Sequence, residues 1–171
     1  RILLTKCDLA TPEQIEKDLK PLVKGEKLGA FGLTEPNAGT DASGQQTKAV
    51  FDEKTNEWVL NGSKIFITNG GQADTYIIFA MTDKSKGNRG ISAFIVDADT
   101  PGFSIGTKEK KMGIRGSSTT ELVFEDVRIQ KDNLLGKEGK GFGIAMSTLY
   151  GGRLGIAAQA LGIAEGALEE A

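Results

Sequence analysis

The segment 34–44 carries the side chains best suited to binding chemistry in this sequence. Residues 35–44 have the sequence Glu-Pro-Asn-Ala-Gly-Thr-Asp-Ala-Ser-Gly and follow the apolar run 28–33. The backbone near Gly39 offers N–H groups, and three hydroxyls lie close by in the sequence, those of Thr34, Thr40 and Ser43. Such a loop suits the oxygens of a polar ligand or a phosphate. Loops of this composition are also common surface connectors, so the residues alone leave both interpretations open.

A second candidate is the segment 64–71, Lys-Ile-Phe-Ile-Thr-Asn-Gly-Gly, which predicts a strand that ends in a turn. Phe66 and Thr68 are two positions apart and would share one strand face. An aromatic ring beside a hydroxyl could cover and hydrogen-bond a flat heteroaromatic ligand. The same pair is more often ordinary core packing, and position alone does not decide between the two.

The composition excludes several classes of function. With 21 basic and 23 acidic residues the formal net charge is -2, which argues against a nucleic-acid partner or an anionic membrane surface. The absence of histidine excludes Ser-His-Asp and Cys-His catalysis and histidine metal sites, and we expect no metal site. Cys7 alone cannot form an internal disulfide, no apolar stretch approaches the roughly 20 residues of a membrane helix, and residues 1–4 are too short for a secretory signal. We therefore expect a small-molecule or protein partner in a reduced, cytoplasmic compartment.

Hydrophobic periodicity predicts helices at both ends of the chain and strands between them. A short helix should begin at Thr11, with Pro12 in its first position, and end near Gly25. Seven alternating runs then predict an antiparallel β-barrel or sandwich, at 46–51, 57–61, 63–68, 75–81, 91–96, 103–107 and 119–129. No helical pattern separates these runs, which argues against a parallel sheet. Helical spacing returns from about Gly141 to Ala171.

Local signals refine this outline. Asn61-Gly62 predicts a tight hairpin with both residues at positive φ, and residues 52–56 predict a looser one. Asn61 also begins a glycosylation sequon, which we set aside because no secretory signal accompanies it. Gly151-Gly152 should weaken or kink the last helix. The chain begins without methionine and ends inside an uncapped helical run, so we expect a part of a longer protein whose other helices cover the last one.

Six motifs in series resemble the acyl-CoA dehydrogenase family. The two longest are Phe-Gly-Leu-Thr-Glu-Pro-Asn-Ala-Gly-Thr-Asp at 31–41 and Leu-Asn-Gly-Ser-Lys-Ile-Phe-Ile-Thr-Asn-Gly-Gly at 60–71. The others follow in the family's order at 99–103, 111–121, 123–127 and 136–142. The run 29–36 is especially similar to bacterial short-chain, or butyryl-CoA, dehydrogenases.

The resemblance implies a mainly β protein, an antiparallel β-barrel flanked by an N-terminal helix and a long C-terminal helix. Residues 1–24 would end an N-terminal helical domain, 25–137 would form the middle flavin-binding domain, and 138–171 would begin a C-terminal helical domain. FAD would bind between the last two. The implied cofactor-binding residues are Phe31, Leu33, Thr34, Gly39, Thr40, Phe66, Ile67 and Thr68, with Thr34 reaching the pyrimidine edge and Thr68 donating toward flavin N5.

The implied reaction is α,β-dehydrogenation of a short-chain acyl-CoA, with electrons passed to an electron-transfer flavoprotein. Substrate contacts would come from Thr40, Asn88, Tyr150, Gly151, Gly152 and Arg153, although the family usually has aspartate where this chain has Tyr150. The family's base is a glutamate in the C-terminal domain, and no residue here matches its motif, so none is assigned as catalytic. Composition predicts a solvated hairpin at 108–111, whereas the resemblance implies that Glu109 lies near the docking surface for the electron-transfer flavoprotein.

Two other functions remain compatible with the sequence. One is a non-catalytic β-barrel that binds a ligand or a partner protein through the loop 34–44. The other is an acyl-CoA oxidase, which shares the architecture but passes electrons to oxygen. The family commonly forms tetramers, so we expect a homo-oligomer for the longer protein, in the bacterial cytoplasm.

Overall fold

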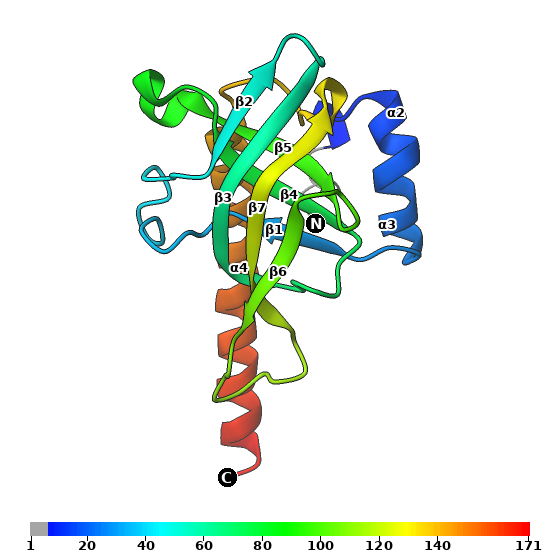
Figure 1. Cartoon of the computed structure of the whole chain (residues 1–171). Helices are drawn as coiled ribbons and strands as arrows, with labels where there is room; N and C mark the ends of the chain where they lie inside the picture. The colour runs from blue at the N-terminus through cyan, green and yellow to red at the C-terminus, as the bar shows by residue number, and fades with distance from the viewer. Residues whose placement is uncertain (1–6) are drawn as a thin grey trace.

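Seven strands form one curled sheet, a half-barrel, in the computed structural model, which describes residues 7–171 (Figure 1). The strands are β1 (Gly29–Gly32), β2 (Lys48–Asp52), β3 (Glu57–Thr68), β4 (Thr75–Met81), β5 (Ile91–Asp97), β6 (Phe103–Lys108) and β7 (Thr119–Gln130). The helices are α2 (Pro12–Gln14), a π-helical turn (Ile15–Leu19), α3 (Lys20–Lys24) and α4 (Gly141–Glu169). Short 3-10 turns occupy Cys7–Leu9, Lys84–Gly90 and Lys131–Asn133. The prediction of a mainly β protein with a helical segment at each end is confirmed.

The sheet is mixed, so the prediction of a purely antiparallel sheet is wrong. β1 pairs in parallel with β4, and β2 adds one further parallel pair to β4 at Lys48 and Met81. The other neighbours, β2–β3, β3–β7, β7–β6 and β4–β5, are antiparallel. Parallel neighbours need a crossover connection, and a helix usually provides it. Here the β2–β3 hairpin provides it, so the sequence between β1 and β4 contains no helical pattern.

The predicted tight hairpin at Asn61-Gly62 is also wrong, because β3 runs unbroken through both residues. The partner strand β7 instead bulges, with Glu125 and Asp126 opposite Asn61. Two hydrogen bonds join Asn61 and Asp126. The Asn61 side chain donates from Nδ2 to Asp126 Oδ1 at 3.0 Å, and the Asp126 backbone N–H donates to Asn61 Oδ1 at 2.9 Å. Of the two residues of the predicted turn, Asn61 and Gly62, only Gly62 has a positive φ, 143°. The looser hairpin at 52–56 is confirmed, since Asp52 pairs with Glu57.

The N-terminal helical segment begins and ends as predicted. Thr11 forms a capping box with Gln14, Pro12 occupies the first turn, and Gly25 ends the segment at φ 74°. The π-helical turn precedes Pro21, which has no N–H and whose ring would clash with the carbonyl four residues earlier. A wider turn there lets the helical path continue past the proline.

Two apolar cores lie on opposite faces of β4 and β5, whose central residues are buried throughout. Alternate residues such as Ile78 and Phe94 face the inside of the half-barrel, together with Trp58 from β3. The residues between them, such as Phe79, pack with Leu19 of the helical segment on the other face. This second core also receives the first turns of α4, and it therefore fixes where α4 starts relative to the sheet.

Only the first turns of α4 pack against the sheet, where Ile144 and Ala145 are buried. The helix continues through Gly151 and Gly152 and projects from the body (Figure 1). Beyond Leu149 the large apolar side chains of α4 are exposed, as expected from their sequence, and they are Tyr150, Leu154, Ile156, Leu161, Ile163 and Leu168. Within residues 7–171, no helix combines the length and the apolar character needed to cross a membrane.

Candidate functional site

A cavity of about 600 Å³ lies where the ends of β1 and β3 meet the start of α4. Its walls come from three parts of the chain that are far apart in sequence: β1 with the segment 33–42 that follows it, the end of β3, and α4. The lining residues are Phe31, Leu33, Thr34, Gly39, Thr40, Asp41, Ala42, Phe66, Ile67, Thr68, Phe142, Met146, Leu149 and Arg153. One side is therefore rich in hydroxyls and aromatic rings, and the α4 side is largely apolar.

The structure brings together all eight residues that the sequence analysis assigned to a cofactor. Each of them lines this one cavity, although they come from β1, the following segment and β3. Of the predicted substrate contacts, Thr40 and Arg153 also line it. Tyr150, Gly151, Gly152 and Asn88 are not among its described lining residues; Tyr150 is exposed on α4, and Asn88 is exposed in the turn Lys84–Gly90.

Phe66 reaches the cavity because β3 bulges at this point. Between the pairs Lys64–Leu122 and Ile67–Thr120, two residues of β3 lie opposite the single residue Glu121 on β7. Phe66 adopts a φ of 57°, an unfavourable conformation for a bulky residue. Phe66 is 59% exposed, whereas the next residue, Ile67, is buried. The bulge thus turns an aromatic ring outward from the sheet into the cavity, and strain of this kind is typical of ligand sites.

The segment after β1 turns tightly and leaves space on its cavity side. Glu35 and Ala38 exchange two backbone hydrogen bonds of 3.2 and 3.1 Å, which close the turn. A Cβ added to Gly39 would meet no atom within 4 Å. Asp41 accepts a hydrogen bond from the Ser43 N–H at 3.0 Å and another from its hydroxyl, and these bonds lower the pKa of Asp41. The cavity therefore has an open backbone edge and keeps a carboxylate at its rim.

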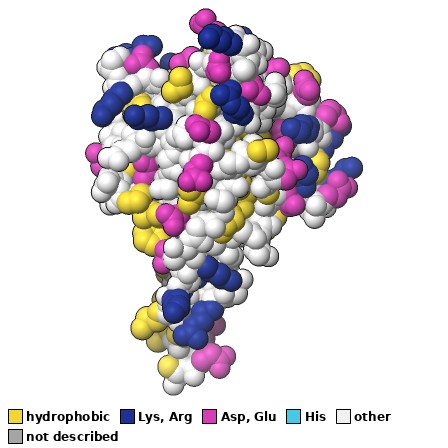
Figure 2. All heavy atoms as spheres, viewed as in Figure 1, with side chains coloured by type: hydrophobic (Ala, Val, Ile, Leu, Met, Phe, Trp, Pro, Cys, Tyr) yellow, Lys and Arg dark blue, Asp and Glu magenta, His cyan; other side chains and the backbone are white. Residues whose placement is uncertain are grey.

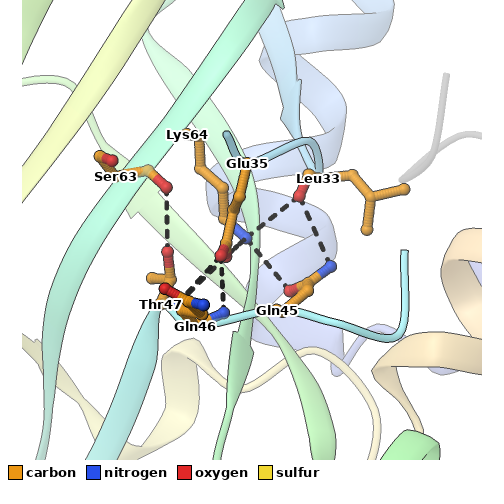
Figure 3. A network of polar contacts seen from close by, with 7 residues as sticks. All are labelled: Leu33, Glu35, Gln45, Gln46, Thr47, Ser63 and Lys64. Atoms are coloured by element: carbon orange, nitrogen blue, oxygen red, sulfur yellow. Dashed lines mark hydrogen bonds and ion pairs between the residues drawn. The ribbon is translucent and has the colours of Figure 1, made fainter. Parts of the chain in front are cut away.

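A buried ion pair lies beneath this segment (Figure 3). Lys64 Nζ is 2.7 Å from Glu35 Oε1 and donates to the Leu33 carbonyl at 3.2 Å and to Gln45 Oε1 at 3.1 Å. Burial lowers the pKa of Lys64 to about 8, although Glu35 opposes the shift. Burial alone would raise the pKa of Glu35, but the Lys64 ammonium and the N–H groups of the 46–47 backbone outweigh it and lower that pKa. The donors around Glu35 therefore favour its charged form, and the carboxylate of Glu35 in turn favours the ammonium form of Lys64.

The sequence analysis did not assign these two residues to the site. The available signal was a lysine in the middle of an apolar strand, Lys64, whose side chain proves to be fully buried. On α4 it named Arg153 but not Phe142, Met146 and Leu149, which also form that wall. Phe142, Met146 and Leu149 do recur at helical spacing in the sequence, but periodicity identifies a helix face and not the element that it faces.

Glu109 lies at a different surface, the loop between β6 and β7. There it lines a second cavity, of about 630 Å³, whose other lining residues are Lys108, Lys110, Lys111, Met112, Arg115, Ser117 and Thr119. Figure 2 shows basic side chains gathered over this loop. Met112 and Ile114 are 98% and 80% exposed. The predicted solvated hairpin at 108–111 is thus the start of a basic loop between β6 and β7, and this loop also carries the two exposed apolar side chains.

Comparison with known proteins gives consistent matches along the chain. A family model described as the acyl-CoA dehydrogenase middle domain matches residues 30–127, and one described as the acyl-CoA dehydrogenase C-terminal domain matches residues 139–171. A short-chain specific acyl-CoA dehydrogenase of Clostridium acetobutylicum is 67% identical over 94% of this chain. The match covers 42% of that relative, so the chain spans about two fifths of its length.

Solved structures agree with the sequence matches. The structure of butyryl-CoA dehydrogenase from Megasphaera elsdenii superposes with a TM-score of 0.87 at 69% identity, over 91% of this chain and 40% of that one. A chain in a structure titled for the electron transferring flavoprotein of Acidaminococcus fermentans gives 0.88 at 64% identity, over 92% of this chain and 41% of that one.

Proposed function

Because the chain belongs to the acyl-CoA dehydrogenase family, we propose that it forms the flavin-facing wall of an FAD-dependent short-chain acyl-CoA dehydrogenase. The observation that carries this proposal is the convergence of eight residues, named from the sequence as cofactor contacts, on one cavity. The proposed reaction is α,β-dehydrogenation of a short-chain acyl-CoA thioester. The similarity to short-chain and butyryl-CoA dehydrogenases supports this substrate class.

The cavity's chemistry fits a flavin. A flat heteroaromatic ring needs an aromatic or apolar wall and a few directed polar groups, and the cavity provides Phe31 and Phe66 together with the hydroxyls of Thr34 and Thr68. The open space beside Gly39 admits a ligand close to the backbone. Bound FAD would supply the acceptor for the two electrons removed from the substrate. In this proposal Phe66 covers one face of the flavin ring and excludes water, while Thr34 and Thr68 hydrogen-bond the polar edge of the flavin.

The substrate would enter from the α4 side. Arg153 is the basic residue in the cavity lining, and a guanidinium suits the phosphate groups of CoA. Thr40 would lie near both the cofactor and the thioester. Asn88, Tyr150, Gly151 and Gly152 would contact outer parts of the CoA moiety, a proposal that rests on the family resemblance.

The rest of the proposal concerns the longer protein. Relatives more than twice as long as this chain leave room for an N-terminal helical domain before residue 25 and for further C-terminal helices after 138–171, with 25–137 as the middle domain. The proton-abstracting carboxylate would come from that C-terminal part. We propose an electron-transfer flavoprotein as the redox partner, near Glu109, and a tetrameric assembly in the bacterial cytoplasm.

The test uses the longer protein that carries this chain, purified with and without FAD. We expect visible flavin absorbance that bleaches when butyryl-CoA is added anaerobically. Thr34→Ala and Thr68→Ala should each raise the FAD Kd about tenfold, the effect of losing one net hydrogen bond of about 1.4 kcal/mol. Thr55→Ala, in an exposed turn outside the cavity lining, is the matched control and should change nothing.

Two results would contradict the proposal. The first is a longer protein that retains no FAD and whose behaviour is unchanged in both cavity variants. The second is turnover of butyryl-CoA by the 171-residue chain alone, because the proposal places the base outside it. Flavin bleaching with oxygen as the efficient acceptor would instead favour an acyl-CoA oxidase.

A further inference from the structure

We propose that Lys64 and Glu35 are positioning residues for the flavin cavity, because their buried contact fixes the segment 33–47 against the strand that carries Phe66 and Thr68. This inference rests on the proposed function. Neither side chain lines the cavity. Both side chains act by holding cavity-lining residues in place.

Among the described residues 7–171, the oxygens that the Lys64 ammonium contacts all come from one part of the chain. Its three acceptors are Glu35 Oε1, the Leu33 carbonyl and Gln45 Oε1, and all three belong to the segment 33–47. Lysine has three donors, so each one is used. Because Lys64 precedes the bulged Phe66 by two residues, this one contact places the segment relative to the aromatic wall.

The Glu35 carboxylate closes the other end of the segment. It accepts the Gln46 N–H at 2.6 Å and the Thr47 N–H at 3.1 Å. Two more bonds join the same segment to β3, from the Ile65 N–H to the Thr34 carbonyl at 2.9 Å and from the Thr47 hydroxyl to the Ser63 carbonyl at 3.0 Å. The two ends of the segment are thus held to one strand.

The cavity-lining residues lie between these fixed ends. Gly39, Thr40 and Asp41 are exposed and line the cavity, whereas Glu35 and Gln45 on either side of them are buried. A loop anchored this closely at both ends has few conformations left. Preorganisation of this kind lowers the entropy lost when a ligand binds.

Stability alone does not explain an ion pair at this place. Lys64 is fully buried and Glu35 is 4% exposed, and the desolvation of two such charges offsets much of their attraction. Neutral residues of similar size often leave stability unchanged at such sites. A pair that is also hydrogen-bonded to Leu33, Gln45 and the 46–47 backbone does, however, specify one geometry for the chain around it.

The test compares wild type with Lys64→Met/Glu35→Gln in the longer protein. The double variant removes both charges together, so no unpaired buried charge remains. We expect a Tm close to that of wild type, an FAD Kd raised at least tenfold, and amide hydrogen exchange at least tenfold faster in residues 34–47 with unchanged exchange in β4 and β5. Arg128→Gln, which removes an exposed ion pair with Asp52 and Glu57, is the control and should change none of the three.

Each outcome decides the matter. If the double variant binds FAD as wild type does, or if its exchange rises equally throughout the sheet, the pair is structural only and the inference is wrong. If the double variant does not fold, the conservative Lys64→Arg replaces it and should show the same selective loss. The exchange measurement needs no flavin, so it tests the inference even if the wild-type protein binds no FAD. Failure of the wild-type protein to bind FAD would contradict the proposed function but not this inference.

Discussion

Gly70 lies so close to Thr120 that a Cβ on Gly70 would stand 2.0 Å from the threonine hydroxyl oxygen. The turn after β3 therefore packs directly on β7, immediately beyond the cavity residue Thr68. We expect Gly70→Ala to destabilise the protein by about 2 kcal/mol, because overpacking of a filled site forces the strands apart. Thermal unfolding of the 171-residue chain would measure this.

The matched control for that substitution is Gly143→Ala. Gly143 lies in the first turn of α4, where an added Cβ would meet nothing within 4 Å. Alanine there should raise stability by up to about 1 kcal/mol, since glycine is the poorer helix former. A loss of stability at Gly143, or none at Gly70, would show that the described packing is not the cause.

A second prediction concerns the positive φ of Phe66. Glycine adopts φ 57° freely, whereas alanine does not, so Phe66→Gly should be more stable than Phe66→Ala by about 1 kcal/mol in the flavin-free chain. Both variants lose the aromatic wall and should bind FAD more weakly in the longer protein. Phe66→Trp keeps an aromatic wall and should retain most of the affinity. Equal stability of the glycine and alanine variants would argue against the bulge.

A third prediction concerns pH. Asp18 is buried, and its Oδ1 atom has no hydrogen-bond partner among residues 7–171. Burial raises its pKa, and the charge of Asp97 raises it further, while Lys17 and Lys27 act in the opposite direction. As pH rises, the unfolded chain therefore releases this proton before the folded chain does. Asp18 thus costs stability progressively as pH increases from the ordinary aspartate pKa of about 4 through the raised pKa of the folded state.

Asp18→Asn removes this titration. We expect it to raise the free energy of unfolding by about 1 kcal/mol at pH 7, equivalent to about 2–4 °C in Tm, and to change little below pH 4. Asp99→Asn at an exposed position is the control and should be neutral at both pH values. A stability difference between wild type and Asp18→Asn that stays constant with pH would show that folding does not raise the pKa of Asp18.

A fourth prediction separates cofactor from substrate contacts. Arg153→Gln in the longer protein should raise the KM for butyryl-CoA about tenfold or more and leave the FAD Kd unchanged, because a charge-assisted hydrogen bond contributes about 1.5–3 kcal/mol. The remaining KM should also depend less on salt. Thr55→Ala, at an exposed position outside the cavity lining, is the control and should have little effect. A change in flavin affinity in Arg153→Gln would assign this residue to the cofactor instead.

Much of the fold followed from local sequence patterns. The cap at Thr11, the stop at Gly25 and the hairpin at 52–56 are set by neighbouring residues, so sequence alone identified them. Asn61-Gly62 has the same hairpin chemistry, yet pairing with β7 along the whole length of β3 overrides it. The parallel partner of β1 could not be predicted either, because four residues with two glycines carry little strand signal.

The candidate site, like the fold, could be predicted from the sequence only in part. The motifs around Phe31, Thr40 and Phe66 identified the cavity wall through the family resemblance, whereas composition left each of them compatible with an ordinary loop or core. The contact between Lys64 and Glu35 joins residues 29 positions apart, and its partners depend on how the segment folds back. A pattern of neighbouring residues does not contain that information.

The parallel pairing of β1 with β4 bears on the order in which the molecule folds. Gly29 pairs with Thr75, far along the chain, and the β2–β3 hairpin lies between them in sequence. The hairpin can form early from local contacts, whereas β1 must wait for β4, since long chain separations slow pairing. The cavity forms only when β1, β3 and α4 have come together, so it is among the last parts of the molecule to fold. A newly synthesised chain would therefore gain the ability to hold a ligand only in its final folding steps, and ligand capture would report complete folding.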